Sequence, residues 1–486
     1  MSPHRRLSGL ALALGCVAAM SGCTLAPRYA RPDAPVPAHF SNAATSAQAA
    51  PDPAAMPAWQ DVFLDPKLRR VISLALDNNR DLRVAMLDID KARAQYHIQR
   101  AALLPAVDAT GQLDRARISD ADSDTGHSQI TRSYDAQLGT SSWEIDLFGR
   151  LRSLKREQLE TWLATGETQR GVRLSLVGEV AGDWLAVANA QRQLELARQT
   201  LASQQETLKL VAYRHDDGIA SGLDLAQVQT SVEGARADVA RHSTALAQAV
   251  DALQLVVGTP VDAALLPGAG DFDAGIALAP LPADLPASVL LQRPDVLAAE
   301  HALKAANADI GAARAAFFPS LSLTAGTGRS SDALSSLFSA GSRTWSFVPS
   351  ITAPIFHAGA LKASLDASKI GKQISVAQYE KAIQSAFADV ADALAERDHL
   401  VERMAAQQAL VGAAQRAYTL ADARYRSGVD GYLQALDAQR TLYAARHDLI
   451  SLQAEEAGNR VALYEVLGGG ADAQPAIAAS GADAGH

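Results

Sequence analysis

The sequence is poor in several residue types on which compact enzyme domains depend. Of its 486 residues only two are cysteine, Cys16 and Cys23, and aromatic residues make up 5%. Because both cysteines precede residue 24, the rest of the chain can form neither a disulfide nor a thiol site. After the first 22 residues no stretch has about 18 uninterrupted apolar residues, which argues against a transmembrane helix. Any crossing of a membrane must therefore use strands.

Positive charge and catalytic motifs are also scarce. The formal net charge is −9 at pH 7 and there is no basic tract, which argues against nucleic acid as a partner. The sequence contains no HExxH, GxSxG or P-loop motif, and its 11 histidines are scattered, so we expect neither enzyme activity nor a cofactor. Asp120–Gly126 resembles a calcium loop, but its glycine is one place late and Thr131 stands where that loop needs Glu. A polar outer loop is the favoured interpretation.

The first 23 residues have the pattern of a secretory leader. A short positive region at residues 4–6 precedes an apolar region, Leu7–Met20, and then Ser21-Gly22-Cys23. Small residues directly before a cysteine resemble a bacterial lipoprotein cleavage box, so residues 1–22 are predicted to be removed and Cys23 to be lipidated. The alternative is ordinary cleavage nearby, with Cys23 unmodified. The Pro- and Ala-rich segment 23–67 is predicted to be an extended, lipid-anchored arm.

Two windows without proline, residues 106–259 and 355–474, predict very long helices. Leu151–Tyr213 and Ala358–Tyr425 can each be one helix of about 95 to 100 Å at 1.5 Å per residue. Helices of that length must pack against one another in a rod or cylinder. The first contains four glycines, which indicate either close helix–helix approach or local breaks: Gly166, Gly171, Gly178 and Gly182.

Each long helix turns back on itself at a tip of small residues. In Arg424–Leu452 the tip is Ser427–Gly431, and 210 positions earlier Gly218 takes the place of Gly428. After each tip, residues recur at alternating three- and four-residue steps, as in the seam of a coiled coil. The second seam comprises Ala435, Ala438, Leu442, Ala445, Leu449 and Leu452, and the first comprises Leu225, Val228, Val232, Ala235, Val239 and His242. The sequence thus predicts two copies of one helical hairpin.

Four stretches between the short and long helices have the period-two pattern of strands. They are Ala106–Arg117, Arg132–Leu147, Ser320–Arg329 and Thr344–Phe356. Each has about ten residues or more, enough to cross a bilayer when tilted. Because four strands cannot close a barrel and open edges are excluded in lipid, several chains must share one barrel. Four phenylalanines at the strand–helix joints indicate either an aromatic girdle or plain packing: Phe148, Phe317, Phe318 and Phe356.

A tandem duplication accounts for nearly all of the chain after residue 67. Helix, proline and strand recur 214 positions apart, at Leu103-Leu104-Pro105 and Phe317-Phe318-Pro319. The predicted class is α+β, with a duplicated, long-helical coiled-coil part joined to transmembrane strands. We place the first repeat at residues 68–259, the connection at 260–286, the second repeat at 287–467 and a disordered tail at 468–486.

Four separated motifs, in a fixed order, carry a family resemblance. They are Cys23–Tyr29, the run SSWEIDLFGRLR at Ser141–Arg152, the segment Leu285–Ala325, and Arg424–Arg440. Together they resemble the TolC-type outer-membrane factors, and in particular the NodT-like lipoproteins of RND multidrug efflux systems. The resemblance covers residues 23–467.

By this resemblance the chain is one of three in a homotrimer, giving four strands to a twelve-stranded transmembrane β-barrel joined to a periplasmic helical barrel. The trimer would be the gated outer-membrane exit duct of a tripartite pump for drugs or other small molecules. An inner-membrane RND transporter would feed it through a periplasmic adaptor protein. The covalent lipid on Cys23, a palmitate-type anchor in outer-membrane lipid, would be its only attached group.

Other interpretations remain open. Within transport, the chain could be the outer-membrane component of a metal-ion efflux or type I secretion system. A periplasmic coiled-coil adaptor or scaffold would share the helices but lack strands of bilayer length. A lipid-anchored periplasmic enzyme should show a polar catalytic constellation, and the sequence contains none that we can identify.

The resemblance also implies a gate at the periplasmic end. The positions that match the family's inward-facing residues are Leu433 and Asp437, one helical turn apart, with Arg440 in reach of Asp437 along the helix or from a neighbouring chain. Their counterparts in the first copy are Leu223 and Gln227, so an acidic ring would belong to the second copy alone. Without the resemblance, Asp437 is a solvated surface carboxylate. If three such carboxylates meet near a threefold axis, acid should relax their repulsion and favour closure.

The two tips are implied to contact the hairpins of the adaptor. Binding there would unwind the second hairpin outward and shift a closed–open equilibrium. Small residues allow close backbone approach, although turn chemistry alone also explains glycine at a tip. The tip positions are Gly218, Ile219, Ala220 and Ser221 in the first copy and Gly428, Val429 and Asp430 in the second.

Overall fold

A computed structural model describes residues 24–40, 58–124, 126–268 and 286–469. The predicted leader 1–22, Cys23, residues 269–285 of the predicted connection and residues 470–486 of the predicted tail lie outside the described residues. The chain forms two compact units. Unit 1 comprises residues 1–33, 88–165 and 298–380, and unit 2 comprises residues 34–87, 166–297 and 381–486.

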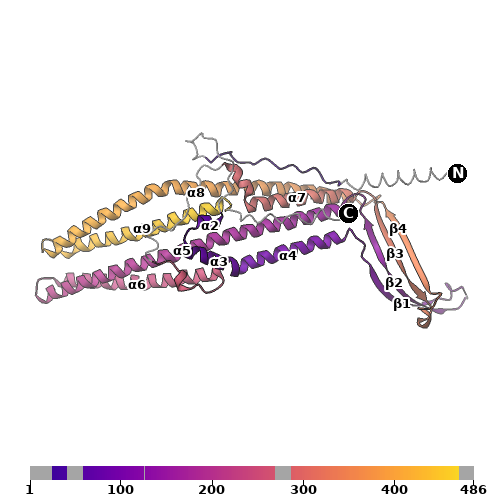
Figure 1. Cartoon of the computed structure of the whole chain (residues 1–486), viewed down its shortest axis with the longest axis horizontal. Helices are drawn as coiled ribbons and strands as arrows, with labels where there is room; N and C mark the ends of the chain where they lie inside the picture. The colour runs from indigo at the N-terminus through magenta and orange to yellow at the C-terminus, as the bar shows by residue number, and fades with distance from the viewer. Residues whose placement is uncertain (1–23, 41–57, 125, 269–285, 470–486) are drawn as a thin grey trace. The chain divides into compact units, whose positions relative to one another are not determined.

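Four helices contain residues of both units. They are α4 (Arg80–Ala101), α5 (Arg150–Asp216), α7 (Pro294–Ala315) and α8 (Ala360–Arg426), each labelled in Figure 1. The helices α5 and α8 have 67 residues each. Each is therefore about 100 Å long, as the two windows without proline predicted.

Unit 1 contains one antiparallel sheet with the strand order β1-β2-β3-β4. The strands are β1 (Asp108–Ile118), β2 (Gln129–Ile145), β3 (Ser320–Ser331) and β4 (Arg343–Thr352). The first repeat is joined to the second where β2 pairs with β3, for example at Leu138 opposite Thr327. A β-bulge between Thr140 and Trp143 interrupts this pairing, and Ser142 inside it has a φ of 52°.

The four strands confirm the predicted strands but differ from them at their ends. β4 ends at Thr352 and not at Phe356, because Pro354 has no N–H with which to continue the ladder. β2 begins at Gln129, earlier than the predicted Arg132, because the β1–β2 pairing continues outward to Ile118 opposite Gln129.

The sheet of unit 1 is open in the single chain. The outer strand β4 is exposed along its whole length and β1 along nearly all of it. Several large apolar side chains of the sheet are exposed: Leu113, Ile130, Leu138, Trp345, Phe347, Val348 and Ile351. Unpaired strand edges and exposed apolar faces are surfaces that a stable assembly must cover.

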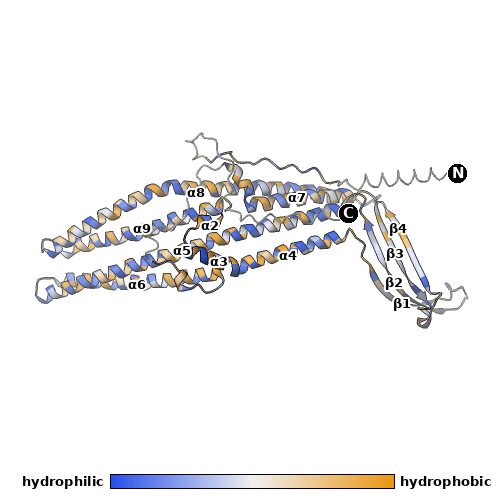
Figure 2. Cartoon of the chain, viewed as in Figure 1, coloured by the Kyte–Doolittle hydropathy of each residue, from blue (hydrophilic) through white to orange (hydrophobic). Residues whose placement is uncertain are grey.

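Unit 2 contains the two helical hairpins, in which α6 (Gly222–Val257) follows α5 and α9 (Tyr432–Val466) follows α8. No predicted seam position is exposed. The buried seam residues are Val228, Val232, Ala235 and His242 on α6 and Ala435, Leu442, Ala445 and Leu452 on α9. Figure 2 shows hydrophobic and hydrophilic residues interleaved along these helices, as expected for narrow packing seams. The two predicted coiled-coil seams are confirmed.

One hydrophobic cluster of unit 2 includes Ile72 of α3 (Pro66–Asn78), Trp184 of α5 and Leu253 of α6. The indole nitrogen of Trp184 donates to the carbonyl of Leu265 at 3.1 Å. The side chain of Asp65 caps α3 by accepting two backbone N–H groups of its first turn. The short elements are α2 (Trp59–Val62), η1 (Ala263–Leu265), η2 (Ala287–Gln292) and, in unit 1, η3 (Leu334–Ser336).

The glycines of α5 do not break it, so the alternative of local breaks is wrong. The nearest atom to one of them belongs to a flexible side chain, so close helix–helix approach is not required there. A Cβ on Gly178 would lie 2.7 Å from a carboxylate oxygen of Glu465, whereas a Cβ on Gly182 would meet nothing within 4 Å. Among the described residues, no helix is both long enough and apolar enough to cross a membrane.

Candidate functional site

The tip of the second hairpin is a tight reversal between α8 and α9. Gly428 has a φ of 73°, which favours glycine, and the N–H of Val429 donates to the carbonyl of Arg424 at 3.0 Å. The Arg424 guanidinium donates to the Asp430 carboxylate, with Nη2 and Oδ1 3.0 Å apart. Asp430 is therefore engaged within the tip, and Val429 is the apolar side chain left exposed at its apex.

The tip of the first hairpin is built in the same way. Gly218 has a φ of 72°, and the N–H of Ile219 donates to the carbonyl of Arg214 at 2.7 Å. A capping box between Ser221 and Asp224 then starts α6. Ile219 is 74% exposed and occupies the place that Val429 has in the second tip. Each tip therefore presents one β-branched apolar side chain directly after its left-handed glycine.

The three predicted gate residues lie on one exposed side of α9. Leu433 is 57% exposed, and Asp437 and Arg440 are also exposed. Within the described residues, no hydrogen bond or ion pair joins the Asp437 carboxylate to the Arg440 guanidinium. The contact predicted along the helix is thus not formed in the single chain. The contact with a neighbouring chain, and the gate itself, stay predictions.

An adjacent side of the same helical turns is held by buried polar groups. Tyr432 and Gln439 of α9 are buried, and the side-chain amide of Gln204 on α5 donates to the Gln439 oxygen at 2.8 Å. The Tyr432 hydroxyl donates to the Gln204 oxygen at 3.3 Å. Burial, with a smaller contribution from Tyr425, raises the pKa of Tyr432 to about 12, so this hydroxyl keeps its proton at neutral pH.

Sequence reasoning did not find the Gln204–Gln439 pair. Gln439 directly follows the seam residue Ala438, at a flanking position where a coiled coil ordinarily carries polar side chains, so nothing in the sequence marks it as buried. The partner could not be identified, because Gln204 lies 235 positions away. The pair ties the first hairpin to the helix that carries the predicted gate residues.

A second buried polar layer lies farther from the tips. His242 on α6 is 8% exposed, and its ring centroid is 6.0 Å from that of His447 on α9. The Arg241 guanidinium is 3.4 Å from His242 Nε2. Burial, followed by the positive charges of Arg241 and His447, lowers the pKa of His242. Gln193 of α5 joins the layer by donating to the carbonyl of His447 at 3.2 Å.

The four phenylalanines at the strand–helix joints do not form one cluster. Phe148 and Phe318 stack with ring centroids 4.7 Å apart. Phe317 is 42% exposed and Phe356 is 84% exposed. Packing accounts for the contact between Phe148 and Phe318. Phe318 is nevertheless 42% exposed as well, so it leaves apolar ring surface open to the surroundings together with Phe317 and Phe356, as an interfacial girdle would require.

No metal site emerges from the part of the chain that the structure describes. No group of three or more His, Cys, Asp or Glu side chains there is arranged to hold a metal ion. The acidic segment around Asp120 and Asp122 lies in the turn between β1 and β2, where the Ser119 hydroxyl donates to Asp122 at 2.7 Å. This is the position of the polar outer loop that the sequence favoured.

Comparison with known proteins places these features in context. A family profile described as outer membrane efflux protein matches residues 71–259 and 285–469, once in each repeat. The chain is 47% identical over 454 residues to the probable efflux pump outer membrane protein TtgC of Pseudomonas putida, covering 93% of each chain. It is 42% identical over 457 residues to the cation efflux system protein CusC of Escherichia coli, covering 94% of this chain and 97% of that one.

Solved structures agree with the fold. A membrane protein from Pseudomonas aeruginosa superimposes with a TM-score of 0.84 at 40% identity, covering 94% of this chain and 100% of the other. The open state of the Neisseria gonorrhoeae MtrE outer membrane channel superimposes with a TM-score of 0.82 at 38% identity, covering 92% and 98%.

Proposed function

The chain belongs to the outer membrane efflux protein family, and from this we propose that three copies assemble into the gated exit duct of a tripartite, RND-type pump. The chain is an outer-membrane efflux component, with its helical part in the periplasm. The proposal adds the homotrimer, the periplasmic adaptor protein and the inner-membrane RND transporter. Drugs or other small molecules would pass from the periplasm to the exterior.

The observation that carries the proposal is the open four-stranded sheet of unit 1. Its strands have 10 to 17 residues, enough to cross a bilayer when tilted, and both outer strands are exposed. An exposed strand edge in lipid leaves backbone groups unpaired, so neighbouring copies must cover β1 and β4. Three copies would give twelve strands, a size at which a closed barrel leaves room for a channel.

The gate proposal rests on the two sides of α9. Tyr432 and Gln439 fix one side by burial, which leaves Leu433, Asp437 and Arg440 free to face sister copies. Three leucines near one axis would exclude water, and three Asp437 carboxylates would repel anions. The exposed Ile219 and Val429 are the apolar contacts that the two tips would offer to the adaptor.

Purification and reconstitution test the proposed function. The full chain should require detergent for extraction from the outer membrane, cross-link as a trimer and form conducting channels in planar bilayers. Release by removal of the lipid alone, as a single chain without conductance, would contradict it. The chain should also restore drug resistance to a strain that lacks its own duct, provided that the matching adaptor and transporter are present.

The relatives suggest a second candidate cargo. CusC is named for cation efflux, whereas some Pseudomonas putida relatives are named for antibiotic or toluene efflux. Metal-ion efflux would therefore show itself as sensitivity to metal salts, and not to drugs or solvents, in a strain that lacks this chain. Type I secretion would leave both sensitivities unchanged and abolish export of a protein.

A further inference from the structure

The N-terminal arm of unit 1, residues 24–33, lies along α7 in the opposite direction to the helix. The Arg314 guanidinium donates to the carbonyl of Leu25 at 3.0 Å, and the Asn307 amide donates to the carbonyl of Pro27 at 2.8 Å. Arg314 and Asn307 are seven residues apart and so lie on one face of α7. Their donors satisfy carbonyls of an extended segment that forms no sheet.

A glycine lets the arm lie directly on the helix. A Cβ on Gly311 would lie 2.8 Å from the backbone nitrogen of Ala26, 2.9 Å from its Cα and 2.7 Å from Ser153 Oγ. Two of these three atoms belong to backbone, which a side-chain rotation cannot move aside. The contact between arm and α7 therefore depends on the absence of a side chain at residue 311.

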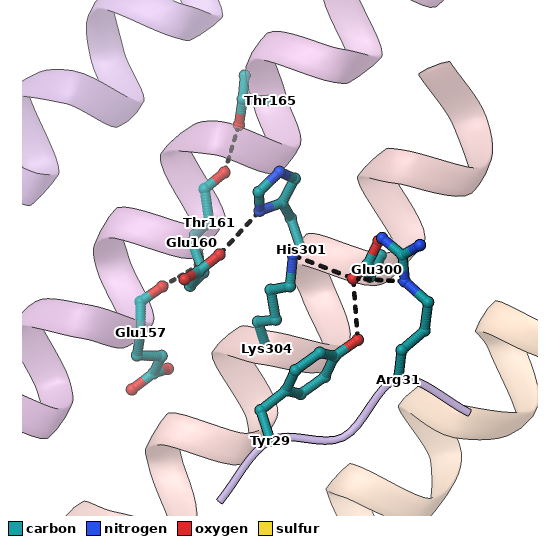
Figure 3. A network of polar contacts seen from close by, with 9 residues as sticks. All are labelled: Tyr29, Arg31, Glu157, Glu160, Thr161, Thr165, Glu300, His301 and Lys304. Carbon is teal, nitrogen blue, oxygen red and sulfur yellow. Dashed lines mark hydrogen bonds and ion pairs between the residues drawn. The ribbon is translucent and has the colours of Figure 1, made fainter. Parts of the chain in front are cut away.

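The far end of the arm is fixed at one buried carboxylate (Figure 3). The Glu300 side chain is only 4% exposed. The Tyr29 hydroxyl donates to Glu300 Oε1 at 3.1 Å, and Arg31 donates to both oxygens, at 3.1 Å and 2.6 Å. Lys304 of α7 is 3.1 Å from Oε1. Two of the three groups that neutralise or bond this carboxylate thus come from the arm.

The protonation states of Glu300 and Tyr29 are those that their hydrogen bonds require. Burial alone would raise the pKa of Glu300, but the hydrogen bonds from Arg31 and Lys304 outweigh burial and lower it. Burial, together with the nearby charge of Glu300, raises the pKa of Tyr29. At neutral pH Glu300 is therefore an anion and Tyr29 a donor, which is the combination that the geometry needs.

The arm adds almost nothing to a hydrophobic core. None of residues 24–33 is buried, and the contacts described above are polar or involve backbone. Docking must then rest on a few hydrogen bonds and ion pairs. Pro27 and Pro32 restrict the free arm, which lowers the conformational entropy lost when it becomes ordered.

We propose that the face of α7 formed by Glu300, Lys304, Asn307, Gly311 and Arg314 is a binding site for an extended peptide, and that its ligand is the arm of this chain. The arm docks reversibly on the finished helices, with Glu300 as its anchor. The hydroxyls of Thr24 and Ser153 lie 3.3 Å apart, so the docked arm holds Thr24 at the first turn of α5. The proposed lipidation of the preceding residue, Cys23, concerns what docking is for and not whether the arm docks.

A spin label on the arm tests the proposal in the full, detergent-purified chain. Ala30 is exposed, so Ala30→Cys can carry the label without filling a packed space. The label should be immobile in this background. Arg31→Gln removes a charge-assisted contact with Glu300, and Gly311→Ala places a methyl group where the backbone of the arm lies. Each should raise the mobile fraction of the label about tenfold or more. The matched control is Arg28→Gln, because Arg28 is an exposed arginine of the same arm without a partner among the described residues.

A double-mutant cycle shows whether the anchor acts directly. Glu300→Gln keeps the shape of the side chain and should loosen the arm as Arg31→Gln does, and the combined variant should loosen it by less than the product of the two effects. Three outcomes would overturn the proposal. The increases in mobile fraction could multiply fully in the combined variant, the arm could stay immobile in Arg31→Gln and Gly311→Ala, or Arg28→Gln could mobilise the arm equally. So would loss of helical circular dichroism in step with the mobile label.

The pH dependence gives an independent readout. The groups facing Glu300 are Tyr29 and Arg31 of the arm, Lys304 of α7 and Tyr379 of α8. Because the pKa of Glu300 is lowered on docking, the arm should be held above the ordinary glutamate pKa and released as the pH falls below about 4. Glu300→Gln should abolish this acid release. If the parent chain, without Ala30→Cys, takes up the label, Cys23 has a free thiol. That outcome would contradict the lipidation of Cys23 but not the docking of the arm.

Discussion

The side-chain amide of Gln204 on α5 donates to the side-chain oxygen of Gln439 on α9 at 2.8 Å, and both side chains are buried. This bond joins the first hairpin to the helix that carries Asp437. Gln439→Leu would leave the buried Gln204 donor unpaired, which costs about 1 to 3 kcal/mol. We expect the variant to loosen the contact between hairpins and to raise the basal conductance of reconstituted channels.

A triple variant makes this prediction sharper. Gln204→Leu and Gln439→Leu are combined with Tyr432→Phe, which removes the hydroxyl that donates to Gln204, so all three members of the buried network are gone. Such a change can be nearly neutral, and conductance should return toward that of the parent. Gln434→Leu is the control, because Gln434 is exposed on the same helix. Equal conductance in the parent and in Gln439→Leu would show that the pair does not restrain α9.

Removing the carboxylate of Asp437 tests the predicted gate. If three such groups converge in the assembly, Asp437→Ala should raise the single-channel conductance and reduce the preference for cations, because mutual repulsion and the negative ring are both lost. Gln227→Ala, at the corresponding position of the first repeat, should change neither. An unchanged current–voltage relation for Asp437→Ala would leave Asp437 as a solvated surface residue.

Two glycines of the sheet allow a test of whether glycine is needed for close packing or only for backbone flexibility. A Cβ on Gly139 of β2 would lie 2.3 Å from the carbonyl oxygen of Ala325 in β3, whereas a Cβ on Gly111 of β1 would meet nothing within 4 Å. Gly139→Ala should therefore destabilise the β2–β3 pairing by about 1 to 3 kcal/mol, the usual cost of overpacking. The measurement is the amount of detergent-extracted oligomer in the outer membrane. Similar losses for Gly139→Ala and Gly111→Ala would contradict the steric explanation.

The lowered pKa of His242 predicts a pH dependence of stability in unit 2. The charged or titratable groups around it are Arg241 and Asp238 of α6 and His447 of α9. The unfolded chain takes up the proton at about pH 6.5, before the folded chain does, so stability is greatest above that pH and falls as the pH drops through the lowered value. Thermal unfolding between pH 5 and pH 7.5, a range of about one unit or more either side of the ordinary pKa, measures this slope.

His242→Leu should flatten the slope, because it removes the titrating ring from the α6–α9 interface. The control is His399→Leu, since His399 is exposed in the same unit. If both variants keep the slope of the parent, another group is responsible for the pH dependence.

Much of the fold could be predicted because its signals are local. The windows without proline predicted α5 and α8, and the stepped recurrence from Ala435 to Leu452 predicted the seam of α9. The predicted end of β4 at Phe356 is too late, because apolar residues continue past Thr352 although Pro354 ends the ladder. The glycines of α5 were ambiguous because the sequence does not say which neighbour, if any, lies over each of them.

The sequence by itself determined the order and kind of the elements, the two tips and the family, since periodicity, turn residues and motifs act over a few neighbouring positions. The tertiary structure alone decided which polar groups meet. Arg31 and Glu300 are 269 positions apart, and Gln204 and Gln439 are 235 apart. No pattern in one chain encodes such distant pairs, because they form only after the long helices have packed and fixed which faces are buried.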